Sequence, residues 1–140
     1  MMPVYRAPMR SRRDEIDAAA TVERALRIGV CGMGVADDDR AESRLERFAA
    51  APVGAFVWTR DGRGRAYVGR ISGAWRYDED GASVDLVNVR DTDWASEPVD
   101  AALIPPSVAQ TFARGGRNFQ QIHPGNVEAE TDLLWERLSS

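Results

Sequence analysis

Apolar-rich runs alternate with turn residues between residues 54 and 94, and this pattern predicts the centre of the fold. Three runs, at residues 55–60, 65–72 and 83–90, hold the β-branched and aromatic residues that favour strands. Asp61 and Gly62 separate the first two runs, and an Asp-Gly pair predicts a hairpin because glycine supplies the positive φ of a tight turn. Both faces of these strands carry apolar residues, which predicts a small barrel covered by helices.

Helical spacing of apolar residues appears on both sides of this stretch. It predicts helices at residues 13–26 and 40–50, and the three aspartates at residues 37–39 are suited to cap the second one. We also expect a first strand at residues 25–30, a short strand at 75–77, a helix at 107–113, a last strand at 118–122 and a helical segment at 131–138. The pattern therefore predicts an α+β fold, a small curved antiparallel β-barrel flanked by short helices.

The N-terminal residues differ from the remainder of the chain. Residues 1–13 hold two prolines, four arginines and no hydrophobic period, which predicts a flexible arm. Residues 14–140 are long enough for one sizeable core and predict a single domain. No apolar run approaches the roughly 20 residues of a membrane span, and acidic residues interrupt the start of the chain where a signal peptide would be apolar. We expect a cytoplasmic protein without membrane contact.

Charge leaves nucleic acid open as a partner. All 18 basic residues are arginines, they face 22 acidic residues, and the net charge is −4. The absence of lysine is typical of codon use in a GC-rich bacterial genome. Arginine nevertheless suits phosphates and base edges because its guanidinium is planar. A mildly acidic chain can carry a basic face, so these arginines matter if the fold gathers them.

Catalytic patterns are weak in this sequence. Cys31 and His123 are single residues of their types, so they provide neither a disulfide nor a metal framework. Gly32 and Gly34 lack the third glycine and the βαβ unit of a dinucleotide loop. No serine lies in a nucleophile elbow. We expect no catalytic residue, no metal and no cofactor, with a thiol dyad of Cys31 and His123 as the remaining enzyme hypothesis.

Aromatic residues give the stronger signal. Trp58, Trp75, Tyr77 and Trp94 all fall between residues 54 and 94. Flat aromatic faces hold an extruded base by stacking, and nearby arginines contact its edge or the flanking phosphates. The alternative interpretation is that these large side chains fill the core.

The runs VWTRDGRGRAYVGRISGAWRYD and VNVRDTDW, followed by PPSVAQTF and NFQQI, resemble EVE-like members of the PUA-like superfamily. The N-terminal modified-base recognition domains of modification-dependent restriction systems are similar. This resemblance covers residues 28–122 and implies a PUA-like pseudobarrel whose relatives bind a flipped, often modified base between aromatic side chains. It implies a base pocket formed by Met33, Trp58, Thr59, Trp75, Tyr77, Arg90 and Trp94.

Together these observations predict a nucleic-acid-binding module that recognises a base, modified and flipped, in DNA or RNA. Phosphate contacts are expected from Arg63, Arg65, Arg70 and Arg117. We expect any effector to be a separate protein. The alternative hypothesis is a protein-interaction or accessory module of a defence or toxin–antitoxin-type system, which uses the barrel as a scaffold and Trp135 of the terminal helix in the contact.

Overall fold

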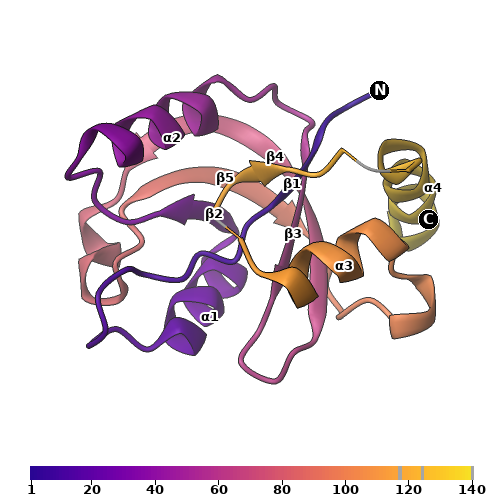
Figure 1. Ribbon diagram of the computed structural model, residues 1–140, viewed down its shortest axis with the longest axis horizontal. Coiled ribbons are helices and arrows are strands. Elements are labelled where there is room, and N and C mark those ends of the chain that lie inside the picture. The colour runs from indigo at the N-terminus through magenta and orange to yellow at the C-terminus, as the bar shows by residue number, and fades with distance from the viewer. Residues whose placement is uncertain (117, 124, 140) are drawn as a thin grey trace.

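The computed structural model describes residues 1–116, 118–123 and 125–139. A curved sheet of six strands forms its centre, in the order β2-β5-β4-β3-β1-β6 (Figure 1). The strands are β1 (Val4–Arg6), β2 (Val30–Met33), β3 (Phe56–Arg60), β4 (Ala66–Tyr77), β5 (Asn88–Trp94) and β6 (Gln120–Gln121). The predicted α+β class and curved sheet are confirmed. The sheet is mixed, because β1 runs parallel to β3, and it stays open between β2 and β6.

Short helices flank the sheet. They are α1 (Ala18–Ile28), α2 (Asp39–Ala50), α3 (Pro106–Arg114) and α4 (Val127–Ser139), with 3₁₀ turns η1 (Glu79–Val84) and η2 (Ala101–Leu103). Figure 1 shows α1 and α2 on the two sides of β2, whereas α3 and α4 lie near β1 and β6. Asp38 caps α2 as predicted, because its carboxylate accepts the N–H of Ala41 at 2.8 Å. Gly29 ends α1 in the left-handed region with a φ of 75°.

The predicted strand at residues 83–90 is displaced in the structure. The chain forms η1 there, and β5 begins only at Asn88. Asp85 adopts a φ of 52°, and its carboxylate accepts the Ser11 hydroxyl at 2.5 Å and the Val35 N–H at 3.3 Å. These local polar contacts hold the segment out of the sheet. By contrast, the two strands expected at residues 65–72 and 75–77 are one continuous strand, β4, with a register shift between Ile71 and Trp75.

The prediction of a flexible arm at residues 1–13 is wrong for the first nine residues. Val4–Arg6 form β1, which lies between β3 and β6 in the sheet. Beyond this strand, Ala7 donates its N–H to the carbonyl of Trp58 at 2.8 Å. Met9 is buried in the left-handed region, and its N–H contacts the side chain of Asn118 at 3.2 Å. A three-residue strand has too short a pattern to be seen in sequence, because its stability comes from distant partners.

Alternating residues of β3 serve two separate cores. Phe56 and Trp58 pack in one cluster with residues of α3 and α4, including Val108 and Leu134. Val57 points to the other face and packs in a cluster with residues of α1 and α2. Both faces of the sheet are therefore buried at β3, as the apolar pattern predicts, whereas the end of β4 is exposed.

Candidate nucleic-acid interface

Arg90 is a buried residue of β5 that joins α2 to the sheet. It is 2% exposed, and its Nη1 donates to the carbonyls of Phe48 at 3.0 Å and Ala51 at 2.6 Å. Its Nε donates to the carbonyl of Gly73 at 2.8 Å. Phe48 and Ala51 lie at the C-terminus of α2, where helix carbonyls lack intrahelical partners and the dipole favours a cation. Burial lowers the pKa of Arg90 from its usual value. Arg90 therefore positions α2 and is not accessible to a base, contrary to the expectation.

Trp58 and Thr59 are also buried, contrary to the expectation that they line an open pocket. Both side chains are fully buried, and the indole N–H of Trp58 contacts the Thr131 hydroxyl of α4 at 3.4 Å. A base would reach Trp58 only if the packing between the sheet and α4 opened, and Thr59 points to the opposite face of β3, where it is equally covered. These residues, predicted as pocket residues, therefore serve the core.

Four other residues lie together on one face of the sheet. Tyr77 is directly paired with Asn88, and Asn88 with Met33, so these three form a row across β4, β5 and β2. Trp75 lies two residues before Tyr77 on the same face. Trp75 and Tyr77 are 44% and 52% exposed, although their partners on β5, Arg90 and Asn88, are buried. We call Met33, Trp75, Tyr77 and Asn88 the aromatic row.

The side chain of Asn88 connects the aromatic row to the loop after β2. This asparagine is buried, its Oδ1 accepts the indole N–H of Trp75 at 3.0 Å, and its Nδ2 donates to the carbonyl of Gly34 at 2.7 Å. Both ends of the amide are therefore used within the protein. Asn88 orients Trp75 and connects β4 to the loop after β2.

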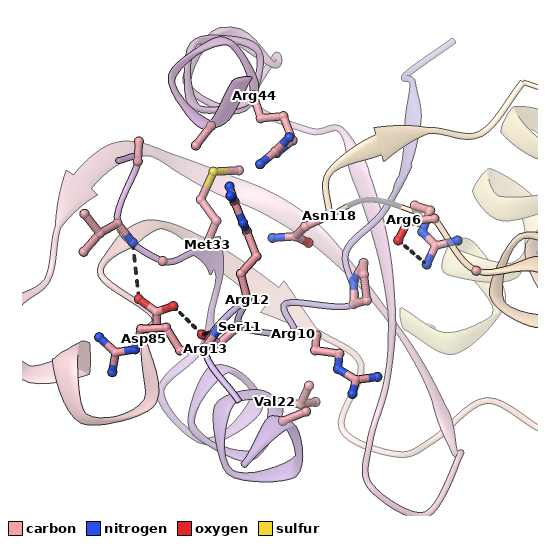
Figure 2. A pocket seen from close by; sticks show the side chains of 18 of the residues that line it. Arg6, Arg10, Ser11, Arg12, Arg13, Val22, Met33, Arg44, Asp85 and Asn118 are labelled. Atoms are coloured by element: carbon pink, nitrogen blue, oxygen red, sulfur yellow. Dashed lines mark hydrogen bonds between the residues drawn. The ribbon is translucent and has the colours of Figure 1, made fainter. Parts of the chain in front are cut away.

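A cleft of about 1410 Å³ begins at Met33 and Gly34. We call it the arginine cleft, because the chain segments around it contribute many guanidinium groups. Figure 2 shows Arg12 extending toward Arg44, with Met33 beside them, and Arg10 and Arg6 farther along. Its arginines are Arg6, Arg10, Arg12, Arg13, Arg40, Arg44 and Arg60, and its acidic residues are Asp37, Asp38, Asp39, Asp61 and Asp85. The cleft therefore has an excess of positive charge in a chain whose net charge is −4.

Several carboxylates of the cleft are already engaged within the protein. Asp38 caps α2 and accepts Arg12 at 3.0 Å, and the hydrogen bond from Ala41 followed by that from Arg12 lowers the pKa of Asp38. Asp61 accepts Arg65 at 2.7 Å. By contrast, Arg6, Arg10, Arg40, Arg44 and Arg60 make no ion pair within the described residues.

Arg6 places a buried positive charge at one end of the cleft. It is 3% exposed, hydrogen-bonds the Thr111 carbonyl, and keeps its Nε without a partner among the described residues. Its guanidinium carbon lies 5.2 Å from the ring centre of Phe112, and that of Arg60 lies 5.6 Å from the same ring. Burial, and then the charge of Arg114, lowers the pKa of Arg6. This corner is electropositive, and Arg6 has no carboxylate partner there among the residues that the structure describes.

Three further predicted residues lie apart from the arginine cleft, around a second groove of about 670 Å³. Trp94, Arg63 and Arg65 line this groove, and the indole N–H of Trp94 donates to the Val30 carbonyl at 2.8 Å. Arg70 is not in either cavity, since its Nε donates to the Gly54 carbonyl at 2.9 Å. Arg117 lies outside the described residues.

The thiol hypothesis gains no support from the structure. Cys31 is fully buried in β2, and burial raises the pKa of its thiol to about 11. Because this pKa lies well above neutral pH, the thiol is protonated there, whereas the nucleophilic form is the thiolate.

Within the described ranges, no three metal-ligating side chains lie close enough to hold an ion. No helix in those ranges is long and apolar enough to cross a membrane.

Sequence reasoning missed most of the arginine cleft. The sequence pattern places Arg10, Arg12 and Arg13 in a flexible arm, although the density of arginines at residues 6–13 is itself a signal. Arg40 and Arg44 are four residues apart on α2, a spacing that places both on one helix face. The sequence does not show that these two sets of arginines lie together, because this depends on the path that the chain takes after β1.

We predict that Arg90→Met lowers the free energy of unfolding by about 3 kcal/mol or more, because it leaves buried carbonyls of α2 without donors. Urea denaturation measures this loss. Arg76→Met is the matched control, since Arg76 is a half-exposed arginine of the same sheet paired with Asp91. Its substitution is expected to change stability by about 0.5 kcal/mol or less. Equal losses in both variants would contradict the role assigned to Arg90.

Comparison with known proteins identifies a fold. No protein-family model matches the chain, and no curated protein matches its sequence. Its structure is similar to the YTH domain of the Zygosaccharomyces rouxii MRB1 protein, which was solved in complex with N6-methyladenosine RNA. The TM-score is 0.53 at 13% sequence identity, and the match covers 98% of this chain and 86% of the other. The chain thus has a fold similar to that of a YTH domain, whereas the narrower EVE-like resemblance stays a prediction.

Proposed function

We propose that this protein is an RNA-binding module that holds the sugar-phosphate backbone in the arginine cleft and stacks a base on the aromatic row. The observation that carries the proposal is the charge of the cleft. Seven arginines face five aspartates there, in a protein whose net charge is −4. The fold similarity to a domain solved with RNA supports RNA over DNA.

The arrangement of the arginines suits a chain of phosphates. They come from the end of β1, from the segment after it, from α2 and from the end of β3, so they line the cleft along its length. Guanidinium groups bind phosphates through two parallel hydrogen bonds. Four accessible ones, Arg10, Arg40, Arg44 and Arg60, have no ion-pair partner among the described residues, so they require no internal salt bridge to break before binding, whereas Arg6 is buried and adds its charge at the end of the cleft.

The aromatic row supplies the base contact. Trp75 and Tyr77 expose their rings on a strand whose partners are buried, and base–aromatic stacking contributes about 1–3 kcal/mol per base. Met33 belongs both to the row and to the cleft wall, so a base on the row adjoins a backbone in the cleft. A methyl group on that base would add apolar surface that matches the exposed rings, whereas Met33 is largely buried beside them. We therefore propose a modified, flipped base as the ligand.

The proposal omits one expected phosphate contact, Arg70, and keeps the expected effector protein. Arg70 is occupied by the Gly54 carbonyl and by the ring of Phe56, 4.8 Å from its guanidinium carbon, so we assign it no phosphate. We still propose that any effector activity triggered by binding belongs to a separate protein.

We predict that the double variant Arg10→Ala, Arg44→Ala binds single-stranded RNA more weakly than the wild type, with a shallower salt dependence. Each lost phosphate contact reduces the slope of log K against log salt by about 0.7. Fluorescence anisotropy at several salt concentrations measures both quantities. Arg47→Ala is the matched control, because Arg47 is an exposed arginine of α2 that does not line the cleft. A double variant that binds like this control would refute the role of the cleft.

The same titrations test the protein-interaction alternative. If the wild type binds neither RNA nor DNA, the proposed function fails, and a module that contacts protein becomes the better hypothesis.

We predict that Tyr77→Ala and Trp75→Ala each remove a preference for oligonucleotides with N6-methyladenosine over those with adenosine. The expected loss of affinity is about 5- to 150-fold, the equivalent of one stacking contact. Arg76→Ala serves as the control, since Arg76 lies between them on β4 and points to the other face. Discrimination that survives both aromatic substitutions would show that the base lies elsewhere.

A further inference from the structure

We propose that the second groove, the one lined by Tyr67 and Trp94, binds a neighbouring nucleotide of the same RNA strand. This inference rests on the proposed function, because the strand must first occupy the arginine cleft. It assigns a nucleotide subsite to a surface that is separate from the aromatic row. The groove residues that carry the argument are Leu26, Arg27, Arg63, Tyr67 and Trp94.

The groove presents a fixed aromatic surface. Trp94 is half-buried, and its hydrogen bond to the Val30 carbonyl holds the indole in place. A Cβ added at Gly69 would lie 2.6 Å from Cε3 of Trp94, so the ring rests on the backbone of Gly69. Tyr67 precedes Gly69 by two residues on β4 and points to the same face, which makes it a diagonal neighbour of Trp94. The two rings therefore offer a stacking platform that costs little ordering on binding.

The charges at the groove favour an anionic group beside the ring. Asp61 is already engaged, because it accepts the backbone N–H groups of Arg63 and Arg65 at 2.9 Å each and the Arg65 side chain at 2.7 Å. These bonds also fix the tip of the β3–β4 hairpin. Arg27 and Arg63 make no ion pair within the described residues, and Glu23 is the remaining acidic residue of the lining. An aromatic ring that carries a phosphate fits this combination.

The two cavities share a wall, which argues for one strand in both. Ala19, Asp61 and Gly62 line the arginine cleft and the second groove alike. At this wall the hairpin tip touches α1, since a Cβ on Gly62 would lie 2.7 Å from that of Ala19. The absence of a side chain at Gly62 keeps the ridge between the cavities low. A strand that leaves the cleft over this ridge enters the groove, where its next base meets Tyr67 and Trp94.

The test compares RNA oligonucleotides of about 4 and about 12 nucleotides, which span the site sizes of such surfaces. We expect the wild type to bind the longer one more tightly. Tyr67→Ala should weaken binding of the longer oligonucleotide by about 5- to 150-fold and leave the shorter one unchanged. Tyr67→Phe, which keeps the ring, should bind both as the wild type does. Thermal unfolding of each variant verifies that the fold is intact.

A second substitution keeps the inference testable if Tyr67→Ala destabilises the fold. Arg63→Glu changes an exposed arginine of the hairpin tip, and it should weaken only the longer oligonucleotide. The inference is overturned if both variants bind the longer oligonucleotide like the wild type while Arg10→Ala, Arg44→Ala weakens it. That result leaves the proposed function standing. Tyr67-dependent binding of adenosine monophosphate, with no effect on oligonucleotides, would also overturn it and assign the groove to free nucleotides.

Discussion

The guanidinium of Arg90 connects the parts of the protein on which the proposed interface depends. It reaches from the middle of β5 to the last carbonyls of α2, and it also holds the carbonyl of Gly73 on β4. α2 carries Arg40 and Arg44 into the arginine cleft, and β4 carries Trp75 and Tyr77 just beyond Gly73. A buried arginine with several carbonyl partners fixes geometry, because each lost bond leaves a buried acceptor. Arg90 thus holds α2, with its cleft arginines, against the strand that carries Trp75 and Tyr77.

The second constraint is the path of the N-terminal segment. β1 inserts between β3 and β6, and the chain then continues along the edge of the cleft, held by Met9 to Asn118 and by Ser11 to Asp85. Asn118 in turn donates to the carbonyl of Gly32 on β2 at 2.9 Å. These contacts place arginines of the segment opposite those of α2. A protein with excess negative charge thereby concentrates positive charge where a phosphate backbone can lie.

The sequence predicts the outline of this fold better than its site. Regular patterns predict α2 almost to the residue, because Asp38 and the apolar face act locally. The β3–β4 hairpin follows from Asp61 and Gly62 in the same way. The role of Arg90 is not predictable from the sequence, since its partners on α2 are backbone carbonyls 42 and 39 residues away in the chain. Trp58 and Trp75 likewise look equivalent in sequence, yet one fills the core and the other is 44% exposed. The difference in their burial depends on how strands that are distant in the sequence pair in the sheet.

We propose that RNA lies across the aromatic row and the arginine cleft, and photo-cross-linking locates bound RNA on the protein surface. Oligonucleotides with a photoreactive base are irradiated with the wild-type protein, and the modified peptides are located by mass spectrometry. We predict cross-links at Trp75 or Tyr77 and in the segment of residues 8–13. Cross-links confined to α4, for example near the exposed Leu133, would contradict the account, because that helix covers the opposite core.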